Sequence, residues 1–284
     1  MKEIDKSILI TGCSSGIGLC TAQALLKKGY KVFATARKSA DVEMLKQLGF
    51  NDALQLDLDD SKSITTAVDT VLERNNGRLY ALFNNGGYQQ PGAVEDLSRQ
   101  MLRENFETNL FGAHELIIRF IPIMRKQGYG RIIQNSSVLG LITLPYRGAY
   151  NATKFAMEGL TDTLRLELSD TNIKVSLIEP GPISGKFKSN SYLAFKNNIN
   201  CESSFHKKNY IGLEKRLTNK TNKAPFTLPP EAVYEKVLHA LESEQPKNRY
   251  YVTKPTYWFA AAKRLLSSKR LDKILINISK KELK

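Results

Sequence analysis

Residues 7–28 read SILITGCSSGIGLCTAQALLKK. The apolar run Ser7–Thr11 predicts a buried strand, and the helical periodicity near residues 16–28 predicts a helix directly after it. The turn between them holds glycines at positions 12, 16 and 18. Glycines permit a tight turn and let the backbone approach a pyrophosphate, and the N–H groups at a helix N-terminus stabilise its charge. The stretch therefore predicts a dinucleotide site, although its G-x3-G-x-G spacing differs from the general G-x-G-x-x-G fingerprint.

The end of the next predicted strand bears on the type of dinucleotide. An acid that binds the ribose diol is expected about 20 residues after the glycines. Ala36 stands at that place instead, and Arg37 and Lys38 follow it. A guanidinium can hold a 2′-phosphate through two hydrogen bonds, whereas a carboxylate would repel it. We therefore expect NADP(H); the alternative is that Arg37 and Lys38 form a solvated turn.

Strand-like and helix-like segments alternate along most of the chain. Such alternation implies right-handed crossovers and a parallel sheet with helices on both faces. The expected fold is α/β, a Rossmann-type doubly wound fold with a mainly parallel seven-stranded sheet. The strands are expected at Ser7–Thr11, Lys31–Thr35, Ala53–Leu56, Leu79–Asn84, Gly130–Asn135, Lys174–Ile178 and Arg249–Val252, and the helices near 16–28, 41–48, 60–74, 98–126, 149–169 and 230–242.

The domain organisation is expected to be simple. The chain has no internal repeat and no low-complexity linker, so we expect a single domain over residues 1–284. Residues 183–228 break the alternation, since they are rich in Asn, Ser and Lys and too long for an ordinary connection. We expect them to form a substrate loop or lid. They end at Pro229-Pro230-Glu231, a favourable helix start, and a basic extension at 255–284 closes the chain.

Charge is distributed unevenly. The chain has 42 Lys and Arg against 28 Asp and Glu, a net charge of +14. Residues 185–228 hold nine cations and two acids, and residues 246–284 hold eleven cations and two acids. No nucleic-acid recognition motif or aromatic platform accompanies these cations. A cationic rim around a site, or contact with an anionic membrane surface, is the favoured interpretation, and nucleic acid is not an expected partner.

Cysteine and histidine usage narrows the protein class. The three cysteines and three histidines show neither metal-ligand spacing nor a disulfide framework, which argues against a zinc enzyme and a secreted scaffold. The charged residues of MKEIDK and the short apolar run after them predict a strand rather than a signal peptide. No apolar stretch of ~20 residues could span a bilayer. We expect no metal and a cytoplasmic location.

Three polar residues surround the expected end of the fifth strand. Ser137 follows the strand, and Tyr150 and Lys154 project from one face of the next helix because they are four residues apart. A neighbouring ammonium stabilises a phenolate, so we expect a tyrosine pKa below its usual ~10, which suits general acid–base catalysis. A serine hydroxyl there can donate to a substrate carbonyl oxygen. A Tyr-x3-Lys pair alone is most often a surface pair, but these residues and the glycine turn are expected at one edge of one sheet.

With these residues the chain resembles the short-chain dehydrogenase/reductase family over nearly its whole length. The family places its serine thirteen residues before the tyrosine, which selects Ser137 over Ser136. Two positions depart from the usual pattern, since Gly86 replaces an alanine and Ser184 a threonine, and neither change removes a functional group. The resemblance rests on TGCSSGIG at 11–18, Asp57-Leu58, Asn84-Asn85-Gly86-Gly87, Asn109, Ser137, Tyr150, Lys154 and Pro180-Gly181.

The resemblance implies a role for each residue. Tyr150 would transfer the proton, Ser137 would polarise the carbonyl, and Lys154 would tune Tyr150 and bind the nicotinamide ribose. Asn109 would hold a water of the proton relay. Asp57 would meet the adenine amino group, and Ile183 would contact the carboxamide through its backbone. The expected cofactor-binding residues are Gly12, Ser14, Ser15, Gly16, Ile17, Gly18, Arg37, Lys38, Asp57, Leu58, Asn85, Gly86, Tyr150, Lys154, Pro180, Gly181 and Ile183.

The segment between serine and tyrosine, VLGLITLPY at 138–146, is strongly apolar. In this fold it would line the substrate cleft, with Phe187, Tyr192 and Phe195 beginning the lid; these residues could equally pack the loop itself. An apolar carbonyl or alcohol is the favoured substrate. Its expected contacts are Ser137, Leu139, Tyr150 and Phe187.

The sequence also resembles bacterial NADP-dependent aldehyde reductases, which are neighbours of hydroxysteroid dehydrogenases and acyl-dihydroxyacetone-phosphate reductases. We therefore expect an NADP(H)-dependent oxidoreductase that interconverts an aldehyde or ketone and its alcohol by hydride transfer. The alternatives are a hydroxysteroid, lipid-ketone, sugar or acyl-thioester substrate, or a nucleotide-sensing protein at a membrane surface that is not an enzyme. The family commonly forms dimers or tetramers through the long helices that hold Asn109 and Tyr150, so a homodimer or homotetramer is expected.

The basic C-terminus contains one apolar stripe. Leu271, Ile274, Leu275 and Ile278 recur at helical spacing among lysines and arginines. A basic amphipathic helix is compatible with peripheral membrane contact, but most such stripes pack on their own domain. We favour packing. The preceding Trp258-Phe259 could cap the pocket or touch lipid.

Overall fold

The computed structural model describes residues 6–219 and 224–283. Its centre is a seven-stranded sheet in the order β3-β2-β1-β4-β5-β6-β7, in which all neighbouring strands are parallel. The prediction of a doubly wound, mainly parallel sheet is confirmed. The strands are β1 (Ser7–Ile10), β2 (Lys31–Ala36), β3 (Leu54–Gln55), β4 (Ala81–Asn84), β5 (Gly130–Asn135), β6 (Ile173–Glu179) and β7 (Arg249–Tyr251).

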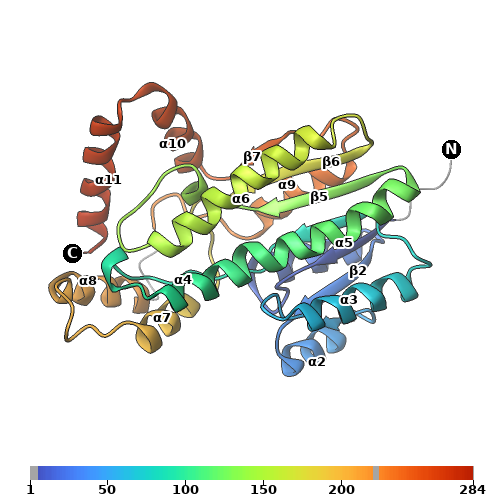
Figure 1. Ribbon diagram of the computed structural model, residues 1–284, viewed down its shortest axis with the longest axis horizontal. Coiled ribbons are helices and arrows are strands. Elements are labelled where there is room, and N and C mark those ends of the chain that lie inside the picture. Colours follow the sequence, from blue (N-terminus) through green and yellow to red (C-terminus); the bar gives the residue numbers. More distant parts are fainter. Residues whose placement is uncertain (1–5, 220–223, 284) are drawn as a thin grey trace.

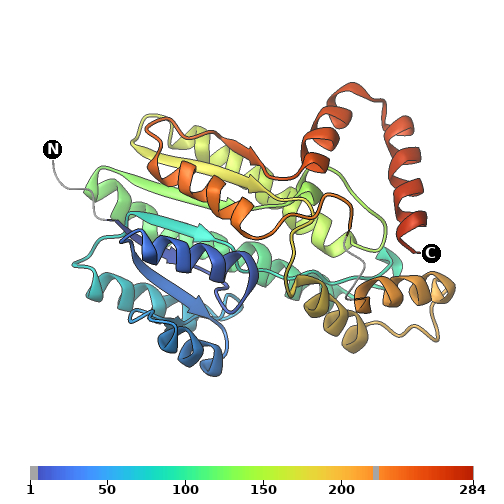
Figure 2. The same cartoon turned by 180° about the vertical axis from the view of Figure 1, so that it is seen from behind.

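Helices cover both faces of this sheet (Figures 1 and 2). The apolar side chains of the two faces form separate buried clusters, and β1 and β4 are buried along their whole length, as their continuous apolar runs predict. One face carries α1 (Gly16–Lys27), α2 (Ser39–Gln47) and α9 (Glu231–Glu242), and the other carries α3 (Ser61–Arg74), α5 (Gly112–Gln127) and α6 (Gly148–Glu167).

The strand order creates a crevice at the centre of the sheet. β1 lies between β2 and β4, so the chain leaves β1 toward one side and returns across it to reach β4. Ligands of open parallel sheets bind at such a switch point, outside the carboxyl ends of the strands. The glycine turn follows β1 and Asn85 follows β4, so two predicted cofactor segments meet at this crevice.

The helix expected over residues 98–126 is interrupted. The structure has α4 (Arg99–Phe106), a π-helical turn at Glu107–Phe111 and then α5. Periodicity did not reveal this turn, because one extra residue in a turn barely changes the apolar pattern. π-Helical turns are frequent at functional sites, and this one contains Asn109.

Four helices lie at the end of the sheet to which the strands point (Figure 1). α7 (Phe187–Asn198) and α8 (Lys207–Thr218) belong to the 183–228 insertion, whose ends are joined because Ser184 N–H donates to Leu228 O at 2.9 Å. α10 (Lys254–Leu265) and α11 (Ser268–Glu282) form a hairpin. Short 3-10 helices occur at Val94–Asp96 and Val138–Gly140. Among the described residues, none of the helices is both long and apolar enough to cross a bilayer.

A buried ion-pair cluster ties α6 to the last two strands. Arg249 on β7 pairs with Glu158 and Asp162 of α6, and its Nη1 lies 2.6 Å from Glu179 Oε1 on β6. Glu179 is fully buried, and burial together with the nearby Glu158 raises its pKa to about 8. Arg249 is therefore the cation that compensates two buried carboxyl groups.

Replacing Arg249 by leucine should lower the free energy of unfolding by about 3–5 kcal/mol, because the buried carboxyl groups lose their partner. Urea unfolding followed by circular dichroism measures this loss. Arg165→Leu is the matched control, since its 3.0 Å pair with Asp162 is partly exposed and should contribute about 0–1 kcal/mol. Similar losses in both variants would contradict a special role for Arg249.

Candidate active site

The glycine turn is shaped by close backbone contacts. Gly12 has φ +71°, and a Cβ there would lie 2.8 Å from Gly86 Cα, so a side chain would push the turn away from the loop after β4. A Cβ at Gly16 would have no heavy atom within 4 Å, so the chain leaves open space over the start of α1. Ser15, the N-cap of α1, makes no side-chain capping bond. The first N–H groups of α1 are therefore available to an anion.

Hydrogen bonds join the ends of β1, β4 and β5 beside this turn. Thr11 Oγ1 accepts from Asn85 N at 2.9 Å and from Gly86 N at 2.7 Å. Asn85 Nδ2 donates to Thr11 O at 2.9 Å, and Asn85 Oδ1 accepts from Asn135 Nδ2 at 2.9 Å. The positioning roles of Thr11 and Asn135 were missed by sequence reasoning, because their partners are distant in the chain.

The residues expected on the adenine side lie along the neighbouring strand ends. Arg37 and Lys38 are exposed directly after β2, and the Arg37 carbonyl accepts from Gln55 Nε2 at 3.0 Å. Burial raises the pKa of Asp59, while its bond from Thr108 and the positive charge of Arg37 act in the opposite direction. The charge of Arg37 therefore acts on Asp59 at this edge of the sheet, while its side chain stays exposed.

Asp57 and Leu58 complete that side. Asp57 Oδ1 accepts from Asp59 N at 3.2 Å, and Asp57 N donates to Ser63 Oγ at 3.0 Å. Leu58 is buried against Gly86. The adenine-side segment is therefore held in place by its own turn and by the loop after β4.

Ser137, Tyr150 and Lys154 come together at the end of β5. Lys154 Nζ donates to Asn135 O at 2.7 Å and lies 5.6 Å from the centre of the Tyr150 ring. Ser137 Oγ accepts from Leu139 N at 3.1 Å, and its hydroxyl lies close enough to Tyr150 to act on the pKa of that residue. Serine, tyrosine and lysine thus form one buried polar group.

Burial controls the ionisation of this group. Burial raises the pKa of Tyr150 to about 12, although the hydrogen bond from Ser137 lowers it. The expectation that Lys154 brings the tyrosine pKa below its usual value is therefore wrong for this structure, because desolvation of the phenolate is the largest influence on this pKa and raises it. Burial also lowers the pKa of Lys154 to about 8, and the negative charge of Glu158 opposes that shift.

Asn109 lies behind this group and is fully buried. Its Oδ1 accepts from Tyr88 N at 2.9 Å, and its Nδ2 donates to Tyr88 O at 2.8 Å and to Thr153 Oγ1 at 3.2 Å. Both N–H groups of the Asn109 amide therefore donate to protein atoms, and the side chain fixes the loop after β4 to α6. Because these donors are used, a water of the expected proton relay would have to be bound by a carbonyl oxygen.

The segment after β6 lies beside the same edge. Pro180 O accepts from Val138 N at 2.8 Å, Gly181 lies against Thr253, and Ile183 bridges to Leu228. Three residues of the predicted cofactor set remain, and all lie in the glycine turn. Ser14 and Ile17 are half-buried, and Gly18 is buried against the Gly12 carbonyl.

Apolar side chains from three parts of the chain surround Tyr150. Phe187, at the start of α7, stacks edge-on with its ring at 5.6 Å, and Leu139 packs on it from the loop after β5. Phe259 of α10 and Leu275 of α11 belong to the same cluster. Of the two roles left open for Phe259, its place in this cluster agrees with capping the pocket, and Leu275 shows the packing that was favoured over membrane contact. The sequence did not show that Leu275 packs beside Tyr150.

Two residues expected to begin the lid have other roles. Phe195 is fully buried and its ring lies 5.3 Å from that of Tyr210 in α8. Tyr192 OH donates to Glu214 Oε1 at 3.0 Å. Both residues hold α7 against α8 and do not face Tyr150. In the C-terminal stripe, Ile274 does not face Tyr150 either, because its side chain is exposed.

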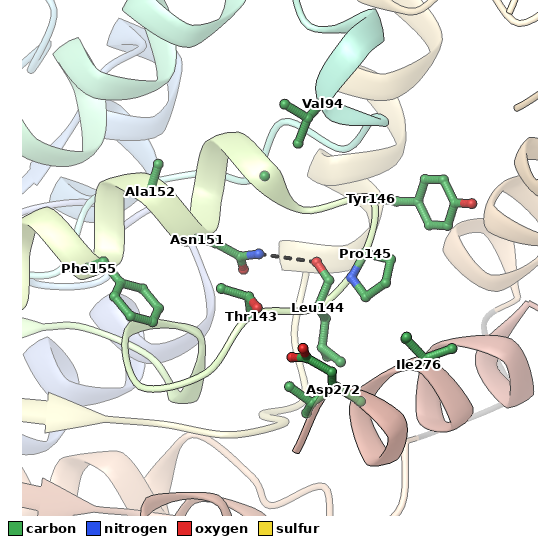
Figure 3. Close-up of a pocket in the computed structure, with 12 residues that line it drawn as sticks. Val94, Thr143, Leu144, Pro145, Tyr146, Asn151, Ala152, Phe155, Asp272 and Ile276 are labelled. Carbon is green, nitrogen blue, oxygen red and sulfur yellow. Dashed lines mark hydrogen bonds between the residues drawn. The ribbon is translucent and has the colours of Figure 1, made fainter. Parts of the chain in front are cut away.

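A cavity of about 550 Å³ lies between α6, the loop at 143–148 and α11. Figure 3 shows Ile276 and Asp272 of α11 near Leu144, whose carbonyl accepts from Asn151 Nδ2 at 3.1 Å. Ser137, Tyr150 and Lys154 do not line it. This cavity therefore lies outside the candidate catalytic group, on the outer side of the substrate loop.

The residues present fit a dinucleotide. The open space at Gly16, the uncapped start of α1 and the exposed cations after β2 lie along one edge, in the order that phosphates and a 2′-phosphate require. Buried polar atoms without a protein partner, Asn135 Oδ1 and Ser136 Oγ, lie next to Ser137 at the same edge.

Comparisons with known proteins agree with this geometry. The family model of short chain dehydrogenases matches residues 6–193. The uncharacterized oxidoreductase YbbO of Escherichia coli K12 is 45% identical over 96% of this chain and 95% of its own. The NADPH-dependent 3-dehydrocapnine reductase of Ornithobacterium rhinotracheale is 31% identical over 96% of this chain and 97% of its own.

Among solved structures, a short-chain dehydrogenase from Streptomyces avermitilis superposes with a TM-score of 0.77. It is 27% identical, and the match covers 99% of this chain and 97% of that one. The chain therefore belongs to the short-chain dehydrogenase/reductase family, the oxidoreductases that act on carbonyl and CH–OH groups.

Proposed function

We propose that this protein is an NADP(H)-dependent oxidoreductase that reduces an apolar aldehyde or ketone to its alcohol, or catalyses the reverse reaction. The observation that carries the proposal is the buried group of Ser137, Tyr150 and Lys154, set among apolar side chains from the loop after β5, α7 and the α10–α11 hairpin. Such a site accommodates an uncharged, apolar molecule with one polar atom at the catalytic end.

The chain's own residues account for the proton chemistry. When bound, the nicotinamide supplies or accepts the hydride. Ser137 donates a hydrogen bond to the carbonyl oxygen as negative charge develops there. Tyr150 donates its proton to that oxygen, and the Lys154 ammonium stabilises the phenolate that remains. The raised pKa of Tyr150 keeps the hydroxyl protonated, which suits the reducing direction.

NADP(H) is favoured over NAD(H) by the charge after β2. Ala36 cannot bind a ribose diol through a carboxylate, while Arg37 and Lys38 are exposed where a 2′-phosphate would lie. One relative is itself named as an NADPH-dependent reductase. The guanidinium of Arg37 is proposed as the main phosphate ligand.

A homo-oligomer is part of the same proposal. Ile118 of α5 and Leu160 of α6 expose about half of their surface, at 52% and 46%. Both residues line a groove of about 450 Å³ between the two helices. A second copy of the chain would cover these apolar side chains.

Tyr150→Phe should reduce turnover by about 10²–10⁴-fold, the usual contribution of general acid catalysis, and leave NADPH binding intact. Loss of NADPH absorbance reports turnover across short and long aldehydes, ketosteroids, sugars and acyl thioesters. Fluorescence titration reports NADPH binding. Tyr129→Phe is the control, because Tyr129 directly precedes β5, at the edge where the strands begin, and its ring packs with that of Tyr80. Undiminished turnover in Tyr150→Phe would refute the assignment, and binding without turnover of any carbonyl would favour the sensor alternative.

Arg37→Ala should weaken NADPH binding by about 1.5–3 kcal/mol, the range for a hydrogen bond to a charged group, and leave NADH binding nearly unchanged. Titration of both cofactors measures the difference. Arg74→Ala removes a half-exposed arginine from the end of α3 and should change neither affinity. Equal losses for NADPH and NADH would mean that Arg37 is structural.

The pH dependence of kcat/KM should report Lys154. The reductive rate should fall as the pH rises through about 8, because the ammonium then loses its proton. Glu158 raises the pKa of Lys154, so Glu158→Gln should move this falling limb to lower pH. Asp162→Asn removes another carboxylate partner of Arg249 and should leave the limb in place. A limb that moves equally in both variants would contradict the role of Glu158.

A further inference from the structure

The α10–α11 hairpin has an inner side that covers the candidate active site. Phe259, Leu271 and Leu275 belong to the cluster that contains Tyr150 and Leu139. The prediction that the C-terminal stripe packs on its own domain is thus confirmed for Leu271 and Leu275. The outer side of the same hairpin makes no such contact, and in both views the hairpin projects from the body of the molecule (Figures 1 and 2).

The outer side of α10 exposes large apolar side chains. Trp258 is 54% exposed and Leu265 is 82% exposed, and they lie on one face because they are seven residues apart in the helix. Phe226 packs edge-on against Trp258 at 4.9 Å and is itself about half exposed. The side chains of Trp258, Leu265 and Phe226 are called the apolar tip below.

Cations flank Leu265 of the apolar tip in the sequence. Residues 263–270 read KRLLSSKR, with four cations and no acid, and the first acid after α10 begins is Asp272. Lys263 is used within the protein, since its ammonium lies 4.5 Å from the centre of the Phe155 ring. Arg264, Lys269 and Arg270 are exposed, and in the described part of the chain none of them has a carboxylate within 4 Å.

The combination of an apolar tip and unpaired cations identifies the partner. Tryptophan and leucine enter the boundary between headgroups and acyl chains, and cations around them are attracted to anionic headgroups. A nucleic acid would use the cations but gain nothing from an exposed leucine. A second copy of this chain would place the same cations opposite one another. The chemistry therefore favours an anionic lipid surface.

We propose that the α10–α11 hairpin docks on an anionic lipid bilayer through Trp258, Leu265, Arg264, Lys269 and Arg270. The inner side of the hairpin would then bring the bilayer next to the cluster around Tyr150. This deepens the proposed function and rests on it: the substrate class becomes an apolar carbonyl compound that partitions into membranes.

Co-sedimentation of the full chain with vesicles tests the proposal. Binding is expected to vesicles of phosphatidylcholine mixed with phosphatidylglycerol, to weaken at high salt, and to be absent with phosphatidylcholine alone. Reversing three cations, with R264E, K269E and R270E together, should lower the partition coefficient by at least about 100-fold, because the loss of each cation alone costs about fivefold and the new carboxylates are repelled by the surface. Leu265→Asp should weaken binding at low salt as well.

A matched control separates docking from general attraction. Lys27, Arg78 and Lys126 are exposed near the opposite edge of the sheet, where the strands begin, and K27E, R78E and K126E together change the net charge equally. This control should bind vesicles nearly as well as the unchanged protein. Equal losses in the two triple variants, binding to neutral vesicles, or a change of oligomeric state without vesicle binding would each overturn the proposal.

The readouts also separate this inference from the proposed function. Vesicle binding is measured without any carbonyl substrate, and turnover of a small water-soluble aldehyde should be unchanged in the R264E/K269E/R270E variant. A protein that docks but turns over no carbonyl would refute the proposed function alone. A protein that reduces aldehydes but does not dock would refute the docking alone.

Discussion

The hydrogen bonds that join the ends of β1, β4 and β5 hold the candidate active site together. Thr11, Asn85 and Asn135 come from three segments, and each uses its side chain on the next strand end. Parallel strands all end at one edge of the sheet, where their last peptide groups lack partners in the ladder. The side chains of Thr11 and Asn85 supply such partners, and the Asn135 amide holds the Asn85 side chain in place. The glycine turn and Lys154, which donates to Asn135 O, therefore keep a fixed separation across the crevice.

Burial then sets the chemistry of that edge. Tyr150 and Lys154 are both buried, so the pKa of the tyrosine rises and that of the lysine falls. In both residues burial disfavours the charged form. Glu158, which pairs with Arg249, raises the pKa of Lys154 and so partly offsets the effect of burial on the ammonium. The buried ion-pair cluster thus stabilises the fold at β6 and β7 and also affects the protonation of Lys154.

The parts of the site that sequence could predict are those encoded by local spacing. The glycine turn, the pair Tyr150 and Lys154, and the strand alternation each depend on residues within one or two elements. Phe259 and Leu275 reach Tyr150 only because a hairpin more than 100 residues later folds back over it. The burial of Phe195 against Tyr210 depends on two helices that the polar 183–228 segment did not reveal. The pKa of Tyr150 was mispredicted for the same reason, because burial comes from these distant contacts.

The α10–α11 hairpin packs against the cluster around Tyr150 with one side and exposes Trp258 and Leu265 on the other. Its inner leucines exclude water from Tyr150, and a water-excluded site strengthens the hydrogen bond that Ser137 can offer a substrate. A closed apolar cover also obstructs an apolar substrate that arrives through water. Substrate held in a bilayer against the outer side of the hairpin would meet this cover directly. The exposure of Trp258 and Leu265, which adds nothing to the core, is explained if those side chains are buried in lipid during turnover.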